Sequence, residues 1–218
     1  SASQIGREAR DIFPRDADKR QRACILAHLA GAHCISRDAG EGLNLAEQAQ
    51  GLFAELGEGV GQAAGLLTEA DLHMVDGDHR SAIRATEEAT KLLVAQKDFK
   101  GEARAFSTAA QAHLGMGDLE AAARAADRSL RASRRSGDKE AYAHTLCLAA
   151  GVYASLCLRQ QAGADEEAAG SAAYDASASC YLRALSASQE AVVIARKFLE
   201  KRDLMAALLT LADMHLLA

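Results

Sequence analysis

The chain has 218 residues, of which 49% are hydrophobic and only 4% aromatic, with one proline and no tryptophan. Much of the apolar fraction is alanine, the best helix former and a poor strand former, so the composition favours closely packed helices over a sheet. A net charge of -5 excludes the basic surface that phosphate backbones require, and we expect no nucleic-acid partner.

Five cysteines are an odd number, and none lies in a Cys-x-x-Cys pair. With no signal-like segment at the start of the sequence, this predicts reduced thiols that pack as small hydrophobes in a reducing, cytoplasmic compartment. No stretch approaches the roughly 18 apolar residues that a membrane span needs, so we expect no membrane partner.

A small residue followed three positions later by a histidine or tyrosine recurs along the chain, in three steps of 40 residues and one of 62. The pairs are Ala30 with His33, Ala70 with His73, Ala110 with His113, Ala150 with Tyr153, and Ala212 with His215. A large residue precedes each small one by four positions: Leu26, Leu66, Phe106, Leu146 and Leu208. Positions i, i+4 and i+7 share one helical face, so each copy predicts a helix, which we call helix A.

A second helix, helix B, is predicted after each of the first four copies. Its small residues keep the same steps of 40, 40 and 62: Gly42, Ala82, Ala122 and Ala184; Ala46, Thr86, Ala126 and Ser188; Ala49, Ala89, Ser129 and Ala191. Gly77-Asp78 and Gly117-Asp118 separate helix A from helix B, and Gly57 and Gly137-Asp138 separate the units. Glycine can adopt the left-handed conformation that ends a helix, and aspartate can cap the next one.

The large–small–ring pattern, the Gly-Asp turn and the small triplet resemble the tetratricopeptide repeat (TPR). The 40-residue length is similar to the longer-helix repeats of kinesin light chain-like adaptors, and the ring is histidine where the family prefers tyrosine. The resemblance implies an all-α, right-handed superhelical solenoid of antiparallel helix pairs. It also implies that helix A lines a concave groove and that helix B faces outward.

The spacing predicts one array with a half repeat at each end. Its parts are a half repeat at 1–20, repeats at 21–60, 61–100 and 101–140, a repeat at 141–202 with an insertion near 159–181, and a terminal helix at 203–218. The insertion is small and acidic at its centre and predicts a mobile loop, either passive or part of a partner site. Uncovered apolar faces on the end helices would favour self-association.

The sequence shows no clear sign of a catalytic site or a metal site. The recurring histidines lie one to a repeat, about 10 Å apart for packed helices, too far to share an ion. Cys24 with Cys34, and Cys147 with Cys157, are ten residues apart on one helix, a span of about 15 Å that no disulfide bridges. With no catalytic triad or glycine-rich phosphate loop, we expect neither an enzyme nor a cofactor.

The remaining hypothesis is a protein-binding scaffold that takes a peptide or partner segment in the concave groove. The family's groove positions project onto small, apolar and polar residues of the A helices. Among them we expect seven to form the peptide-binding groove: Asp71, Met74, Arg104, Ser107, Gln111, His144 and Asp213. Too few of the groove residues are Lys, Arg or Asn for the family's carboxylate clamp. The position of the adaptors' asparagine ladder holds Gly31, Asp71, Gln111, Gly151 and Asp213, and three of these could hydrogen-bond a peptide main chain. The alternative is a structural segment of a larger assembly that uses its ends or its convex face.

Overall fold

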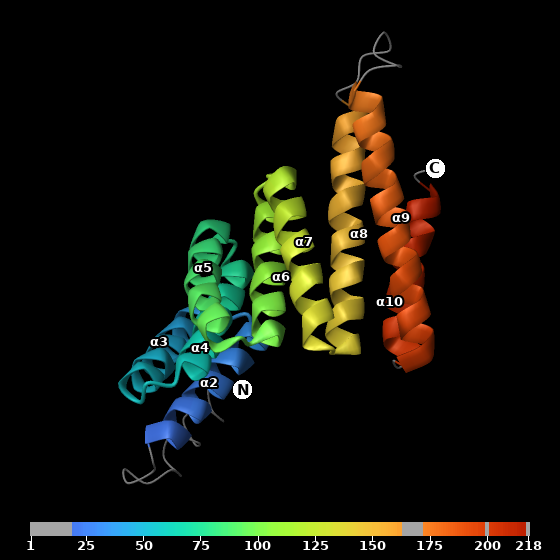
Figure 1. Ribbon diagram of the computed structural model, residues 1–218. Coiled ribbons are helices and arrows are strands. Elements are labelled where there is room, and N and C mark those ends of the chain that lie inside the picture. Colours follow the sequence, from blue (N-terminus) through green and yellow to red (C-terminus); the bar gives the residue numbers. More distant parts are fainter. Residues whose placement is uncertain (1–18, 163–171, 199–200, 217–218) are drawn as a thin grey trace. The chain divides into compact units, whose positions relative to one another are not determined.

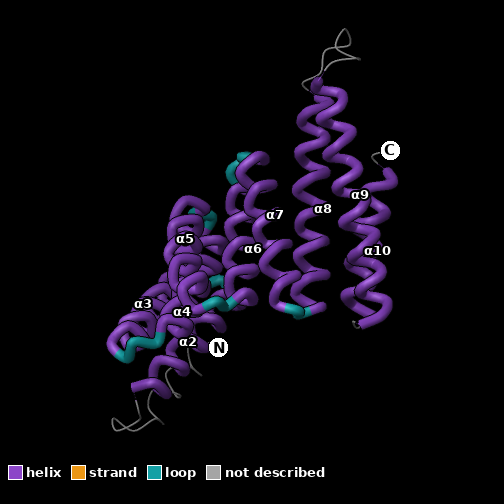
Figure 2. The backbone as a smooth tube through the Cα atoms, in the orientation of Figure 1, coloured by secondary structure: helices purple, strands orange, loops and turns teal. Residues whose placement is uncertain are grey.

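The computed structural model describes residues 19–162, 172–198 and 201–216, which form helices joined by short turns, with no strand among them (Figure 2). The all-α prediction is confirmed. The chain divides into two compact units, residues 1–112 and 113–218. Residues 1–18 of the predicted half repeat at 1–20 lie outside the described part of the chain.

The first unit holds two complete helix pairs and most of a fifth helix (Figure 1). Helix α2 (Lys19–Ser36) packs on α3 (Ala39–Glu55), and α4 (Gly59–Asp76) packs on α5 (His79–Gln96). Helix α4 also contacts both α3 and α2, so these first two A helices lie side by side. Helix α6 (Phe99–Gly115) follows as the third helix A.

The second unit continues the alternation with α7 (Leu119–Ser136), α8 (Lys139–Ala162), α9 (Ala172–Phe198) and α10 (Lys201–Leu216). Helix α8 packs on α7 and α9, and α10 contacts both α9 and α8. Figure 1 shows α8 and α9 as a long antiparallel pair. Helices A and B therefore alternate as the repeat predicts, and the arrangement of antiparallel helix pairs is confirmed.

The small positions of the repeat are where the helices approach one another. Ala30, Ala70, Ala110 and Ala150 on the A helices are all 0% exposed. The twelve small residues predicted on the B helices, from Gly42 to Ala191, are all buried. At Gly42 an added Cβ would lie 2.6 Å from Leu72 Cδ2 and 2.9 Å from His33 Cβ, so both A helices that carry these residues pack directly on helix B.

The turns follow a 20-residue spacing, half the repeat. Six residues at the helix ends have left-handed backbone: Arg37, Gly57, Gly77, Lys97, Gly117 and Gly137. An acidic residue follows each of them. Four aspartates accept a hydrogen bond from the backbone N–H three residues later and so cap the next helix: Asp78, Asp98, Asp118 and Asp138. Arg37 and Lys97 adopt this left-handed conformation although they are not glycines, which the repeat pattern did not predict.

The fourth repeat differs from the prediction at its insertion. Much of 159–181 is helical, because α8 runs to Ala162 and α9 begins at Ala172; residues 163–171 lie outside the described part. The two helices have 24 and 27 residues, against 17 or 18 in α2 to α7. Contacts between their added turns explain the extension: Cys157 and Ser177 are both buried and lie 3.3 Å apart, Sγ to Oγ.

Helix α8 is also long and apolar enough to cross a membrane by length and composition, which corrects the expectation that no stretch approaches this limit. Most of this apolar window, 61%, is buried within the unit. Tyr142, Leu146 and Ala150 of α8 form a cluster with Ala187 and Val192 of α9, as the core helix of a helix bundle does.

Candidate functional site

The first unit brings two of the predicted groove residues into contact. Arg104 of α6 donates a hydrogen bond from Nη2 to Asp71 Oδ2 of α4 over 2.6 Å. The hydroxyl of Thr108, one turn further along α6, donates to Asp71 Oδ1 over 3.3 Å. The Arg104 and Asp71 side chains are 52% and 34% exposed, so this pair lies on an open surface that the two A helices share.

Helix α2 adds a thiol to the same surface. Cys34 Sγ lies 4.0 Å from the Thr68 carbonyl oxygen of α4. Burial raises the pKa of this thiol, and the negative charge of Asp71 raises it further, against the opposing effect of Arg104. Cys34 therefore stays a neutral, poorly nucleophilic group beside the ion pair.

The other predicted groove residues also lie on A helices. Met74 and Ser107 are half-buried and Gln111 is exposed in the first unit, while His144 of α8 and Asp213 of α10 are exposed in the second. Two glycines at ladder positions leave room on these helices, since a Cβ added at Gly31 or Gly151 would meet nothing within 4 Å.

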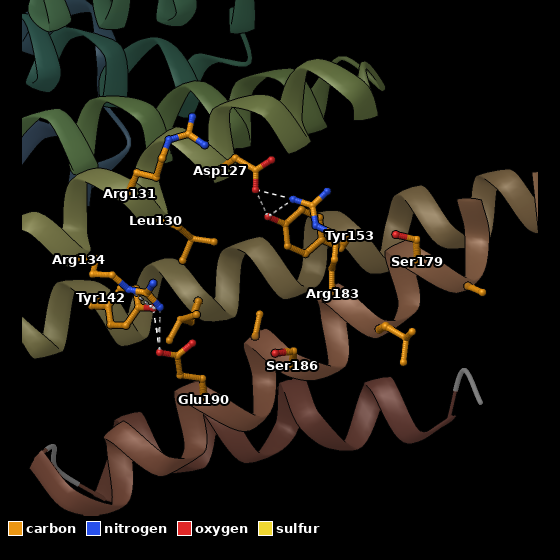
Figure 3. A pocket seen from close by; sticks show the side chains of 14 residues that line it. Asp127, Leu130, Arg131, Arg134, Tyr142, Tyr153, Ser179, Arg183, Ser186 and Glu190 are labelled. Carbon is orange, nitrogen blue, oxygen red and sulfur yellow. Dashed lines mark hydrogen bonds and ion pairs between the residues drawn. The ribbon is translucent and has the colours of Figure 1, made fainter. Parts of the chain in front are cut away.

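A pocket of about 700 Å³ in the second unit was not foreseen from the sequence (Figure 3). Residues of the two B helices, α7 and α9, and of helix α8 line it. Leu130, Leu146 and Ala187 supply apolar lining, and Leu182 of α9, 62% exposed, belongs to the lining as well. The pocket therefore lies on the helix B side of the unit.

One polar corner of the pocket joins all three helices. The Tyr153 hydroxyl of α8 donates to Asp127 Oδ1 of α7 over 2.5 Å, and Arg183 Nη2 of α9 donates to the same oxygen over 2.5 Å. The Arg183 guanidinium also lies over the Tyr153 ring, 4.1 Å from its centroid. Burial, followed by the Asp127 carboxylate, raises the pKa of Tyr153, so the phenol stays neutral and serves as a donor.

The second corner repeats the same chemistry eleven residues earlier on α8. The Tyr142 hydroxyl donates to Glu190 Oε1 over 2.9 Å and accepts from Arg134 Nη2 over 2.6 Å, as Figure 3 shows. Burial and then the bond to Glu190 raise the pKa of Tyr142, so this phenol is neutral too. Eleven residues of helix place the two corners about 16 Å apart along α8.

A comparison of the repeat copies would have revealed the second of these corners. Position 127 is acidic in the first three copies, as Glu47 and Glu87 are, and the fourth copy has Gln189, so Asp127 carries no special signal. Tyr142 and Arg134, by contrast, replace Glu102 and Val94 of the preceding copy. A residue type that differs from the one at the same position of the other copies, at a position that faces a neighbouring helix, is therefore the signal of such a corner in the sequence.

The fold is similar to that of solved helical repeats. Over 91% of this chain and 87% of that one, it matches a crystal structure of nearly identical TPR-like repeats from a kinesin light chain-like protein of Podosopora anserina. That structure is of a single-substitution variant; the TM-score is 0.67 and the sequence identity 14%. Another structure of the same repeats matches 92% of this chain and 88% of its own, with a TM-score of 0.66 and 13% identity. No protein-family model and no curated protein matches the sequence.

Proposed function

We propose that this chain, which has a TPR-like fold, is a non-catalytic adaptor that binds a peptide or partner segment along the surface of its A helices. Folds of this kind typically serve as protein-interaction scaffolds. The observation that supports this surface in particular is the Asp71–Arg104 ion pair. It holds a carboxylate and a guanidinium in fixed, partly exposed positions on neighbouring A helices.

The pair can engage an extended peptide without large rearrangement. A peptide N–H can share the Asp71 carboxylate, and a peptide carbonyl can accept from the remaining donors of Arg104, which has five N–H groups. The open space at Gly31 leaves room for a partner's bulky side chain nearby. Affinity would then come from apolar burial beside a few oriented polar groups.

Selection of ligands from a phage-displayed library of short random peptides tests this proposal. Asp71→Lys combined with Arg104→Glu reverses both charges and still allows the two side chains to pair, so the fold should persist. We expect the selected peptides to bind this variant at least about tenfold more weakly by fluorescence anisotropy. Glu87→Lys with Lys91→Glu on α5, two exposed side chains one turn apart, is the matched control and should leave Kd unchanged.

A second candidate is favoured by the pocket between α7 and α9: contact through the helix B side, as a structural segment of a larger assembly. The same selected peptides distinguish the two. Peptides that lose binding to Leu182→Asp and bind the Asp71→Lys, Arg104→Glu variant normally would overturn the groove proposal and support the helix B side.

We also propose a reducing, cytoplasmic location, because all five cysteines are free thiols and Cys24 is exposed. Labelling of Cys24 by a thiol reagent in freshly lysed cells, without prior reduction, is the expected result. A modification that blocks Cys24 in the cell extract and is removed by reduction would contradict it.

A further inference from the structure

A buried imidazole nitrogen near the end of α2 faces two carboxylates. The His33 side chain is 2% exposed, and its Nδ1 atom has no hydrogen-bond partner. The nearest acid is Asp38, whose Oδ2 lies 3.6 Å from Nδ1, beyond hydrogen-bonding distance. Glu41, from the first turn of α3, brings a second carboxylate, and the three donor atoms lie within 4.8 Å of one another.

Asp38 behaves unlike the equivalent aspartates of the other turns. Four of them cap the following helix through the backbone N–H three residues later: Asp78, Asp98, Asp118 and Asp138. Asp38 makes no side-chain cap bond, although Asp38 and Glu41 have the spacing of a capping box. The carboxylate that serves the backbone elsewhere therefore lies beside the histidine here.

Three donors meet only at this turn among the residues that the structure describes. His73 with Asp78 and His113 with Asp118 repeat the first two members of the group. The position of Glu41 is occupied by a serine in the second copy and by an alanine in the third, Ser81 and Ala121.

We propose that His33, Asp38 and Glu41 form a binding site for a divalent transition-metal ion, with Zn²⁺ the best fit. An imidazole nitrogen with two carboxylate oxygens suits zinc, and three protein ligands leave a fourth position for water. No histidine of another repeat is needed. Asp38 is 54% exposed, so its side chain can close to the distance of about 2 Å that coordination requires.

The bound ion would tie the end of α2 to the start of α3. It would also fix the His33 ring, whose Cβ lies where a side chain at Gly42 would have to go. The effect is structural: because the site requires the folded turn, metal binding adds directly to the stability of the first helix pair.

The test is a zinc titration of the metal-stripped full chain by calorimetry. Cys24 and His28 are exposed one turn apart on α2 and offer a competing pair, so all proteins carry Cys24→Ser and His28→Gln. We expect one ion bound per chain, a rise in the unfolding temperature with zinc, and a zinc-induced ¹⁵N shift of His33 at Nδ1. Glu41→Ser, which installs the residue of the second copy, should weaken binding at least about tenfold while the chain stays folded.

The matched control is His73→Gln, at the same place in the second copy, which should bind zinc like the parent. The proposal is overturned if zinc produces no heat, if the NMR shift falls on Nε2, or if Glu41→Ser binds as tightly as the parent. An unfolding temperature that does not respond to zinc also overturns it. His33→Gln removes the imidazole ligand and should abolish zinc binding; if this variant does not fold, Glu41→Ser still decides the outcome.

Discussion

At the scale of single residues, glycines compensate for large neighbours in the preceding helix B. A Cβ added at Gly61 would lie 2.4 Å from the Phe53 ring, and one added at Gly101 would lie 2.4 Å from Leu93 Cδ2. In the third copy the large residue is replaced by Ser133, and the glycine by Ala141. A large side chain on helix B therefore faces a glycine on the next helix A, and a smaller side chain faces an alanine.

This pairing of sizes predicts that the effect of Gly101→Ala on stability changes sign with the size of residue 93. Gly101→Ala gains about 1 kcal/mol of helix propensity, but overpacking against a Leu93 side chain that is 2% exposed costs about 1–3 kcal/mol, so the variant should be less stable. In a Leu93→Ala background only the Asp98 carboxylate stays close, with Oδ2 2.8 Å from the added Cβ. That carboxylate is the end of a flexible side chain and can turn aside, so Gly101→Ala should be stabilising. Urea denaturation of the four proteins of this double-mutant cycle measures both effects.

The cap beside Gly101 does not explain the effect, because Ala121 takes the same position beside its own capping aspartate, Asp118. A destabilisation by Gly101→Ala that is equal in both backgrounds would therefore contradict the packing argument.

The thiol beside the Asp71–Arg104 pair provides a second residue-scale prediction. The pKa of Cys34 is raised by burial and by Asp71 and lowered by Arg104, and only the thiolate reacts with alkylating agents. Asp71→Asn should lower the pKa and speed alkylation near neutral pH, whereas Arg104→Gln should raise the pKa and slow it. The measurement is the rate of iodoacetamide modification at Cys34 against pH, followed by mass spectrometry.

Exposed Cys24 on the same helix is the internal control for this experiment, and its rate should not change in either variant. Rates at Cys34 that move in the same direction in both variants would mean that altered exposure, and not charge, controls the thiol.

At the scale of the elements, two turns carry residues that do not suit their backbone. Lys97 and Arg37 have φ of 56° and 57°, where glycine serves at the other four turns. A left-handed backbone costs a residue with a Cβ roughly 1–2 kcal/mol. Lys97→Gly should therefore stabilise the chain by about 1 kcal/mol, despite the greater flexibility of unfolded glycine.

Lys91→Gly makes the same chemical change within α5, the helix that Lys97 ends, and provides the control. It should destabilise the chain by about 1 kcal/mol, because its backbone is helical. If both substitutions change the unfolding temperature in the same direction, the left-handed backbone at Lys97 does not destabilise the chain.

The elements themselves were largely predictable, because periodicity is a local property of the chain. The 40-residue steps placed helices α2 to α8, the 62-residue step placed α9 and α10, and Gly77-Asp78 and Gly117-Asp118 marked two of the turns. The extension of α8 and α9 was not predictable, since it depends on contacts such as that of Cys157 with Ser177. Asp71 and Arg104 were both predicted as groove residues, but their pairing was not, because a contact between residues 33 apart depends on how helices stack.

At the scale of the whole molecule, the final helix leaves apolar side chains uncovered. Met205 and Leu209 of α10 are 65% and 61% exposed, while Ala207 between them is buried against the α8–α9 core. A helix of a repeat array normally buries such a face against the next helix. We therefore expect the isolated chain to associate with itself through α10 at high concentration.

The double substitution Met205→Lys and Leu209→Lys should keep the chain monomeric. The measurement is sedimentation velocity over the concentration range in which the sedimentation coefficient of the parent rises. Lysine is a good helix former, so helicity by circular dichroism should be retained. Ile35→Lys, at a side chain of α2 that is 88% exposed, is the control and should associate like the parent. Association that survives the α10 substitutions and is lost with Ile35→Lys would place the contact in the first unit and remove this role from α10.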